Sequence, residues 1–185
     1  PWLLSLRLRK YITGVVGWLD RGPEPIVLDR HHPTFLFGAN MAFRKSIFEE
    51  VGLFRTDLGR AGKGLLTGEE SELLGRVLRA NKRVVYMPAA VVHHRIPLSY
   101  LRLAYARRWQ FNAGRSSVVM ADDGRGLPRW LIRECASHGV AALRSYARRE
   151  AEAGIEQELI FWSQLGQITE HVNRLWQAGT ARSCS

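Results

Sequence analysis

The sequence is poor in cysteine and has no long apolar run. Its two cysteines, Cys135 and Cys184, are too few for a disulfide framework or a cysteine-rich metal site, so a reducing cytoplasmic setting is expected. No uninterrupted apolar run approaches the roughly 20 residues that a membrane-spanning helix requires. The first residues, from Pro1 onward, also lack the charged, apolar and small-residue order of a signal peptide. The chain is therefore not expected to cross a bilayer by itself, and we expect further sequence upstream of Pro1.

Acidic residues are scarce compared with basic ones. The 185 residues include 27 Lys and Arg but 17 Asp and Glu, and the net charge is +10. Over residues 100–150, ten arginines and four acids leave +6. A hydrophobic fraction of 46% and a charged fraction of 24% are ordinary for a folded domain, which excludes a disordered chain. The charge predicts an anionic partner, and composition leaves this open between nucleic acid, acidic lipid headgroups and a phosphorylated ligand.

The most informative stretch is residues 67–74, Thr-Gly-Glu-Glu-Ser-Glu-Leu-Leu. Its three carboxylates follow a glycine-rich loop over residues 59–68 and precede apolar residues with a period near 3.6, which predicts an amphipathic helix. The buried face would carry Leu73, Leu74, Val77 and Leu78. The carboxylates then lie at the helix N-terminus, where they can present a base to a ligand and where the helix dipole favours negative charge. The alternative is structural, because Thr67 and Glu70 also match a capping box.

Short strands and helices are predicted on both sides of this stretch. Strands are expected over residues 26–28, 84–86 and 91–92, and over the apolar residues 35–44, which a Gly-Ala-Asn step interrupts. A short helix should begin near Ser46 and end at Gly52. His31 and His32 suggest a metal, but neighbours in sequence on a loop rarely supply a complete site.

Helices are predicted at both ends of the chain. Residues 2–19 could form a short amphipathic helix, and Pro128 suits the first turn of another helix. Apolar residues at helical spacing between Ile155 and Leu175 predict a long amphipathic helix. Between these, residues 107–111 interleave arginines with aromatic side chains.

Five segments in this order resemble the acceptor-side half of the family 2 glycosyltransferases, which have the GT-A fold. They are GANMAFR at residues 38–44, FEEVGLF at 48–54, the glycine loop, GEESEL at 68–73 and VVYMPAAVVHH at 84–94. The resemblance covers residues 33–117. It implies an α/β fold in which residues 1–117 form the C-terminal, acceptor-side part of a Rossmann-like GT-A domain. Residues 118–185 would follow as basic amphipathic helices suited to a membrane surface.

The resemblance also implies an activity and the residues that carry it. A sugar would pass from a nucleotide-diphospho-sugar donor to a hydroxyl of a saccharide or lipid-linked acceptor, with inversion. Glu70 takes the position of the family's aspartate general base, and Glu69 that of an acid contacting the acceptor sugar. His94, with His93 as the alternative, would bind a divalent metal, Mg²⁺ or Mn²⁺. The residues of the Gly-Ala-Asn segment, Gly38, Ala39 and Asn40, would bind substrate.

The arginines of residues 107–109 resemble a further family motif. Arg107, Arg108 and Trp109 are similar to an arginine-aromatic motif that lies near the diphosphate and acceptor in processive members. The alternative is that these arginines belong to a solvated or lipid-facing helix surface. The residues alone leave both possibilities open.

The family's nucleotide-binding half, with its βαβ units and Asp-x-Asp-type motif, is absent from the sequence. The chain is therefore expected to be part of an enzyme, inactive alone, that works in the cytoplasm or on the inner face of the cell membrane. One alternative is a nucleic-acid-binding module, although no recognised motif supports it and no nucleic acid is expected. Another is a membrane-binding domain without activity, because basic helices carrying tryptophans suit an anionic lipid interface. These tryptophans are Trp130, Trp162 and Trp176.

Overall fold

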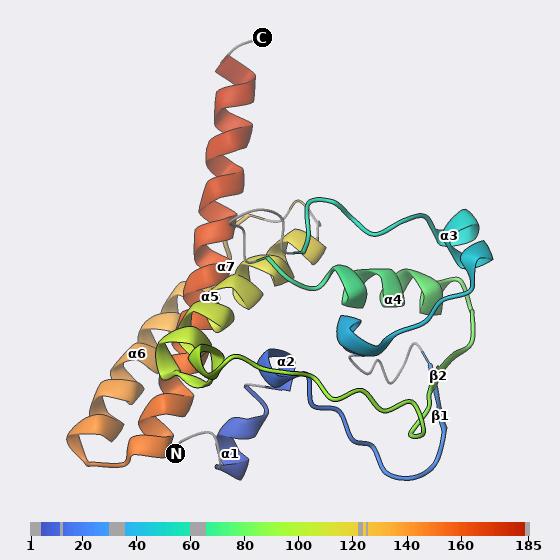
Figure 1. Ribbon diagram of the computed structural model, residues 1–185. Coiled ribbons are helices and arrows are strands. Elements are labelled where there is room, and N and C mark those ends of the chain that lie inside the picture. Colours follow the sequence, from blue (N-terminus) through green and yellow to red (C-terminus); the bar gives the residue numbers. More distant parts are fainter. Residues whose placement is uncertain are drawn as a thin grey trace.

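The computed structural model describes residues 5–11, 13–29, 36–59, 66–121, 124 and 126–183. Within them the chain forms a bundle of three long helices, with short helices and a two-stranded sheet to one side of it (Figure 1). The predictions for residues 2–4, for His31 and His32 and for the glycines at 62 and 64 lie outside the described residues.

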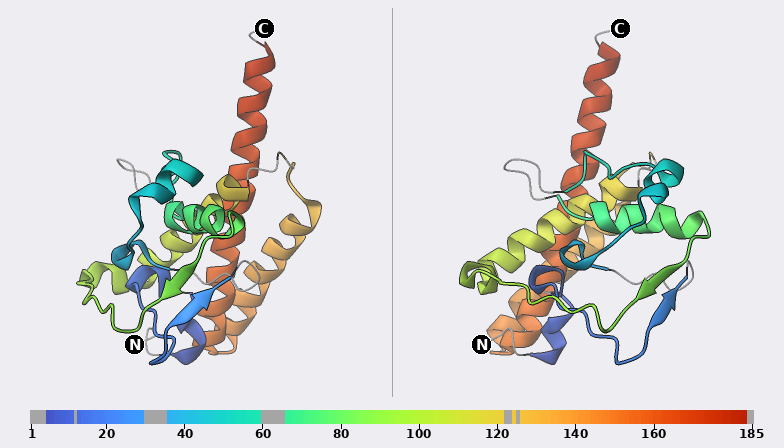
Figure 2. Two further views of the ribbon diagram at one scale, coloured as in Figure 1. Left: turned by 90° about the vertical axis from the view of Figure 1, so that its right-hand side faces the viewer. Right: turned by 45° about the vertical axis from the view of Figure 1, so that its right-hand side comes forward.

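The bundle consists of α5 (Leu103–Ala121), α6 (Arg129–Ala147) and α7 (Ala151–Ser183). Helix α7 lies between the other two and packs against both, and its C-terminal end projects beyond them (Figures 1 and 2). The predicted amphipathic helix over residues 155–175 is confirmed as part of α7, with Leu159 fully buried. In the part of the chain that the structure describes, no helix combines the length and apolar character needed to cross a bilayer.

Two glycines set the closeness of α5 and α7. A Cβ on Gly114 of α5 would lie 1.8 Å from the Ser163 carbonyl oxygen, and a Cβ on Gly166 of α7 would lie 1.9 Å from the Phe111 carbonyl oxygen. Neither position has room for a side chain, so the two helices meet backbone to backbone. Ion pairs join the same helices on either side of this crossing, from Arg107 to Glu158 and from Arg115 to Glu170.

The smaller region contains the sheet and two of the short helices. Strand β1 (Ile26–Leu28) pairs antiparallel with β2 (Val84–Tyr86), with Val27 opposite Val85. Helix α3 (Lys45–Val51) ends at Gly52, as the sequence predicts, and the φ of Gly52 is positive, at 81°. Helix α4 (Glu69–Arg79) buries the predicted apolar face, and Asn81 after it is left-handed, with a φ of 54°. The buried side chains of α4 are Leu73, Leu74, Val77 and Leu78.

Several predicted elements differ in the structure. Residues 38–40 form a 3-10 turn rather than part of a strand, and residues 91–92 are exposed and lie outside any described strand. A strand needs a neighbour to pair with, and β2 is the partner of β1 in the described sheet. The predicted N-terminal helix is divided into α1 (Leu6–Arg9) and α2 (Thr13–Val16), and Gly17, with a φ of 63°, follows the second.

The α/β expectation holds in a coarse form. The described chain is mixed but rich in helix, and its small two-stranded sheet does not by itself establish a GT-A fold. The predicted boundary between residues 117 and 118 falls inside α5, which packs along α7. The division into residues 1–117 and 118–185 stays a prediction.

Candidate active site

The start of α4 is held against the helix bundle. Gly68 precedes the helix with a φ of 98°, and a Cβ on it would lie 2.8 Å from the Met120 sulfur. The Thr67 N–H donates to Ser116 Oγ (2.9 Å), and that hydroxyl donates to the Asn112 carbonyl oxygen (2.8 Å). The predicted capping box is wrong, because Gly68 takes the cap position and no side chain caps the helix. Contacts to α5 fix this end instead.

Glu72, one of the three carboxylates, has a structural role. It accepts hydrogen bonds from Arg76 Nε one turn later, at 3.0 and 2.9 Å. Arg76 also donates to the Val51 carbonyl oxygen and, at 2.7 Å, to that of Leu53. Glu72 is therefore engaged in joining α4 to the end of α3.

Glu70 faces a cavity instead. A cavity of about 510 Å³ is lined by Gly38, Met41, Phe43, Phe54, Glu69 and Glu70. Glu70 Oε2 is buried and has no hydrogen-bond partner within the described residues. A buried acceptor without a partner costs about 1–3 kcal/mol, which a ligand that donates a hydrogen bond would recover. The position of this carboxylate therefore suits a group that receives a proton or hydrogen bond from a bound molecule.

Two glycines leave space around the carboxylates. A Cβ on Gly38 would lie 3.7 Å from Glu70 Oε1, so the turn at residues 38–40 comes directly against Glu70. A Cβ on Gly59, whose φ is 88°, would lie 3.0 Å from Glu69 Cδ. The structure thus brings together Gly38, Glu69 and Glu70, which the sequence predicts for one site.

Aromatic rings make part of the cavity lining apolar. Phe43 and Phe54 line it, and both pack on Phe48 of α3, with ring centroids 5.6 to 6.2 Å apart within the trio. An apolar wall beside a few polar groups is typical of small-molecule sites. Sequence reasoning did not assign these rings to the site, although they belong to the GANMAFR and FEEVGLF segments. Their three-dimensional proximity was the missing signal.

The other two residues of the Gly-Ala-Asn segment, Ala39 and Asn40, lie outside the cavity lining. Asn40 Nδ2 donates to the Ala90 carbonyl oxygen at 2.6 Å, which ties the turn to the segment after β2. Ala39 is exposed, and neither it nor Asn40 lines the cavity. Of the three residues 38–40, Gly38 is the one that borders the cavity.

The loop before α4 is joined to α5 by an arginine. Arg55 donates two hydrogen bonds to Asp57, at 3.0 and 2.6 Å, and a third to the Val119 carbonyl oxygen at 3.2 Å. The hydrogen bonds from Arg55 hold the pKa of the exposed Asp57 carboxyl below its usual value. This contact fixes the chain between Phe54 and Gly59, two residues already placed beside the carboxylates.

The predicted arginine-aromatic motif lies in the first half of α5. The Arg107 guanidinium donates to Glu158 at 2.9 Å, and its pKa is raised chiefly by that hydrogen bond. Trp109 packs against the core beside α2, where a Cβ on Gly14 would lie 3.1 Å from its ring. Arg108 is exposed and forms no ion pair within the described residues. Arg107 and Trp109 therefore contribute to helix packing, whereas the charge of Arg108 has no ion-pair partner within the described residues.

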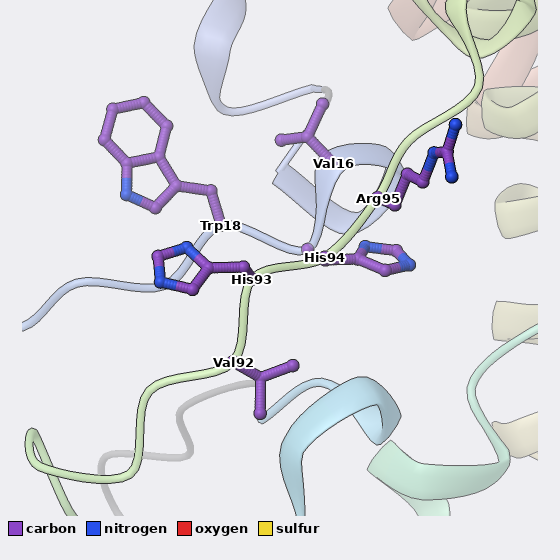
Figure 3. Close-up of a pocket in the computed structure, with 7 residues that line it drawn as sticks. Val16, Trp18, Val92, His93, His94 and Arg95 are labelled. Atoms are coloured by element: carbon purple, nitrogen blue, oxygen red, sulfur yellow. The ribbon is translucent and has the colours of Figure 1, made fainter.

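His94 lies in a second pocket, apart from the carboxylates. This pocket, of about 380 Å³, is lined by Val16, Gly17, Trp18, Val92, His93, His94 and Arg95 (Figure 3). The rings of His93 and His94 extend to opposite sides of the chain in this view. A Cβ on Gly17 would lie 3.0 Å from His94 Nδ1, so the imidazole packs on the backbone after α2.

A metal ion at His94 would need further ligands. Across the described ranges, no group of three or more His, Cys, Asp or Glu side chains is placed to hold a metal ion. Mg²⁺ is often held by one or two carboxylates together with substrate phosphates and water, so a site of this kind does not require three protein ligands. His94 as a metal ligand stays a prediction.

Most of the features described above fall within the match to a known protein family. The model of a family described as Glycosyl transferase family group 2 matches residues 26–169. The match begins at β1, contains the cavity and its two carboxylates, and continues through α6 into α7. It therefore extends on both sides of the 33–117 range covered by the sequence motifs. No curated protein and no solved structure matches the chain.

Proposed function

The chain belongs to glycosyl transferase family group 2, and from this premise we propose that it transfers a sugar from a nucleotide-diphospho-sugar to an acceptor hydroxyl, with inversion. The family match supports glycosyl transfer as the class of reaction. One observation carries a carboxylate base at the start of α4: Glu70 Oε2 is buried, without a partner within the described residues, in a cavity. Glu69 lines the same cavity, and the resemblance of the GEESEL segment to the family motif assigns the base to its second acid, Glu70. Glu72, two residues later, is paired with Arg76 and is not available for this role.

The proposed step is a single displacement. The acceptor oxygen forms a bond to the anomeric carbon while the bond from that carbon to the diphosphate breaks. The hydroxyl proton passes to Glu70, and the electron pair of the broken bond leaves with the nucleoside diphosphate. Attack from the face opposite the leaving group inverts the anomeric carbon. A general base of this kind contributes about 10²–10⁴-fold to the rate.

The cavity suggests how the acceptor would bind. Phe43 and Phe54 would pack against the apolar face of a saccharide or lipid-linked acceptor, and Gly38 leaves room for the acceptor beside Glu70. Glu69, which lines the same cavity, would orient the acceptor through its hydroxyls. Fixing the acceptor oxygen within hydrogen-bond reach of the base is the requirement that this arrangement serves.

The donor side of the site is the less defined part of the proposal. We propose Arg108, rather than the engaged Arg107, as the arginine that meets the donor diphosphate, because its exposed guanidinium is free of ion pairs within the described residues. No step is assigned to a metal ion. The sheet, α3 and α4 would form the acceptor-side part of a GT-A domain.

The stereochemical outcome tests this proposal. The enzyme, expressed from its complete reading frame, would be incubated with uridine, guanosine and thymidine diphospho-sugars and saccharide or lipid-linked acceptors. Release of nucleoside diphosphate identifies the donor, and the proton NMR coupling of the new glycosidic bond identifies its anomer. We expect the anomer opposite to that of the donor. A product that retains the donor configuration would contradict a single displacement with Glu70 as the base.

A further inference from the structure

The outer side of α6 concentrates positive charge. Leu131, Cys135 and Ala142 are the buried residues of this helix, which packs against α7. Helical spacing places Arg129, Arg133 and Arg144 on the opposite side, four and eleven residues apart, and all three are exposed. Figures 1 and 2 show α6 at the outside of the bundle, with α7 between it and α5.

These arginines are not neutralised by the protein. Within the described residues, none of the three forms an ion pair or hydrogen bond through its side chain. The arginines of α5 differ, because Arg107 and Arg115 pair with glutamates of α7. The bundle thus pairs arginines at its helix contacts and leaves those on the outside of α6 available for a partner outside the chain.

Large apolar side chains lie among these arginines. Trp130 is 53% exposed and Leu143 is 71% exposed, and they flank the arginine row on its two sides. Val140 lies within the row and is 46% exposed. An apolar group with an uncompensated charge of this kind suits a surface that has both an apolar interior and negative headgroups. Tryptophan is favoured at such an interface because one end of its ring is apolar and the other is polar.

We propose that this α6 outer face, consisting of Arg129, Trp130, Arg133, Val140, Leu143 and Arg144, docks on an anionic lipid surface. The arginines would meet lipid phosphates while Trp130 and Leu143 enter the headgroup boundary. A second copy of the chain is disfavoured as the occupant, because a two-fold contact through this face would bring its arginines together. Nucleic acid would satisfy the arginines but would leave the exposed leucine and valine against a charged backbone.

Docking through α6 would leave the cavity accessible. Helix α4, which carries Glu70, and helix α6 lie on opposite sides of α7 (Figures 1 and 2). The proposal does not depend on the catalytic assignment, since binding to lipid can be measured without any reaction. Failure of one proposal would therefore leave the other intact.

Vesicle flotation tests the docking face. The chain would be mixed with vesicles of phosphatidylcholine alone or with phosphatidylglycerol added, at low and high salt. We expect binding to the anionic vesicles, weakened by salt. Each arginine near such a surface strengthens binding about fivefold, so the triple variant Arg129→Gln, Arg133→Gln and Arg144→Gln should lose on the order of 100-fold.

A matched control removes the same charge elsewhere. The substitutions Arg44→Gln, Arg79→Gln and Arg83→Gln alter exposed arginines near α3 and α4, which form no ion pair within the described part of the chain. This variant should keep most of the vesicle binding. Equal losses in the two triple variants, or equal binding of the unaltered chain to neutral vesicles, would overturn the proposal. The proposal would also be overturned if the unaltered chain bound oligonucleotides and not vesicles, and if the α6 triple variant alone lost that oligonucleotide binding.

Discussion

Glu70 and Glu158 are both glutamates with partly buried carboxylates, and they differ in what surrounds them. Glu158 accepts hydrogen bonds from Arg107 (2.9 Å) and from the Tyr146 hydroxyl (2.6 Å). Glu70 has one buried oxygen without a partner within the described residues. Removing a partner of a paired buried carboxylate is destabilising, whereas a carboxylate oxygen that is already unpaired costs stability until a ligand arrives. At the residue scale, this difference separates a structural acid from a proposed catalytic one.

The paired carboxylate predicts a dependence of stability on pH. Burial favours the protonated form of Glu158, but hydrogen bonds from Arg107 and Tyr146 outweigh this and lower its pKa from the usual value of 4.5. The contribution of Glu158 to stability is therefore fully present above its ordinary pKa of 4.5 and is lost as the pH falls through the lowered pKa of the folded state. Burial and the neighbouring Glu158 raise the pKa of Tyr146 to about 12, so its hydroxyl remains a donor up to strongly alkaline pH.

Glu158→Gln should accordingly destabilise the protein at neutral pH. Removing the charge weakens the hydrogen bonds from Arg107 and Tyr146, and we expect a loss of about 1–2 kcal/mol in the free energy of unfolding. Denaturant unfolding at pH 7 and at about pH 3 measures it, and the difference from the unaltered chain should shrink at the lower pH.

Glu24→Gln is the control, because Glu24 is exposed and has no hydrogen-bond partner within the described residues. It should change the free energy of unfolding by less than about 0.5 kcal/mol. A Glu158→Gln variant as stable as this control at neutral pH would show that the Arg107–Glu158–Tyr146 contact does not stabilise the bundle.

At the scale of elements, the contact between α5 and α7 organises the bundle. Gly114 and Gly166 allow each helix to approach a carbonyl oxygen of the other. Side chains from the same helix α5 then reach the start of α4, through Ser116 and Met120, and the Val119 carbonyl accepts from Arg55. The position of the proposed base therefore depends on a helix packed elsewhere against α7.

The crossing predicts opposite effects for two glycine substitutions. Gly114→Ala would place a methyl group 1.8 Å from the Ser163 carbonyl oxygen, so the helices must separate. We expect a loss of about 3 kcal/mol or more in the free energy of unfolding. Gly179→Ala, on the projecting part of α7, meets nothing within 4 Å and should stabilise the helix by about 0.5–1 kcal/mol.

Thermal and denaturant unfolding of the two variants provide the measurement. The sign of the change should differ between them, although both replace a helical glycine by alanine. A Gly114→Ala variant as stable as the unaltered chain would contradict the backbone contact between α5 and α7.

At the scale of the whole molecule, local patterns predicted individual helices well. The period of the apolar residues Leu73 and Val77 indicated the buried face of α4, and Gly52 marked the end of α3 correctly. The motifs also indicated that Gly38 and Glu70 belong to one site, and the structure places them in contact with the same cavity.

Features that depend on distant partners were not predictable in this way. Thr67 matched a capping box, but its N–H is taken by Ser116, a residue 49 positions away. A glycine such as Gly114 lowers helix propensity when the sequence is considered alone. Its role in the close approach of α5 and α7 becomes apparent only with Ser163 of α7 beside it. Val91 and Val92 have the composition of a strand and lack a pairing neighbour among the described residues. In each case a long-range contact, or its absence, decided the outcome.

The parts together suggest a division of labour in the enzyme. The bundle holds the start of α4, the cavity between α4 and the aromatic rings would receive the acceptor, and the α6 outer face would hold the molecule at a lipid surface. Such a position would suit a lipid-linked acceptor, which reaches the enzyme from that surface. The central claim within this account is that Glu70 removes the proton from the acceptor hydroxyl.

Steady-state kinetics of Glu70→Gln and Glu72→Gln in the enzyme expressed from its complete reading frame test that claim most directly. The two substitutions make the same chemical change two residues apart, at a carboxylate facing the cavity and at one paired with Arg76. We predict that Glu70→Gln lowers kcat by about 10²–10⁴-fold with little change in the KM for the donor. Glu72→Gln should retain kcat and unfold at a lower temperature. A Glu70→Gln enzyme with the kcat of the unaltered protein would contradict the account.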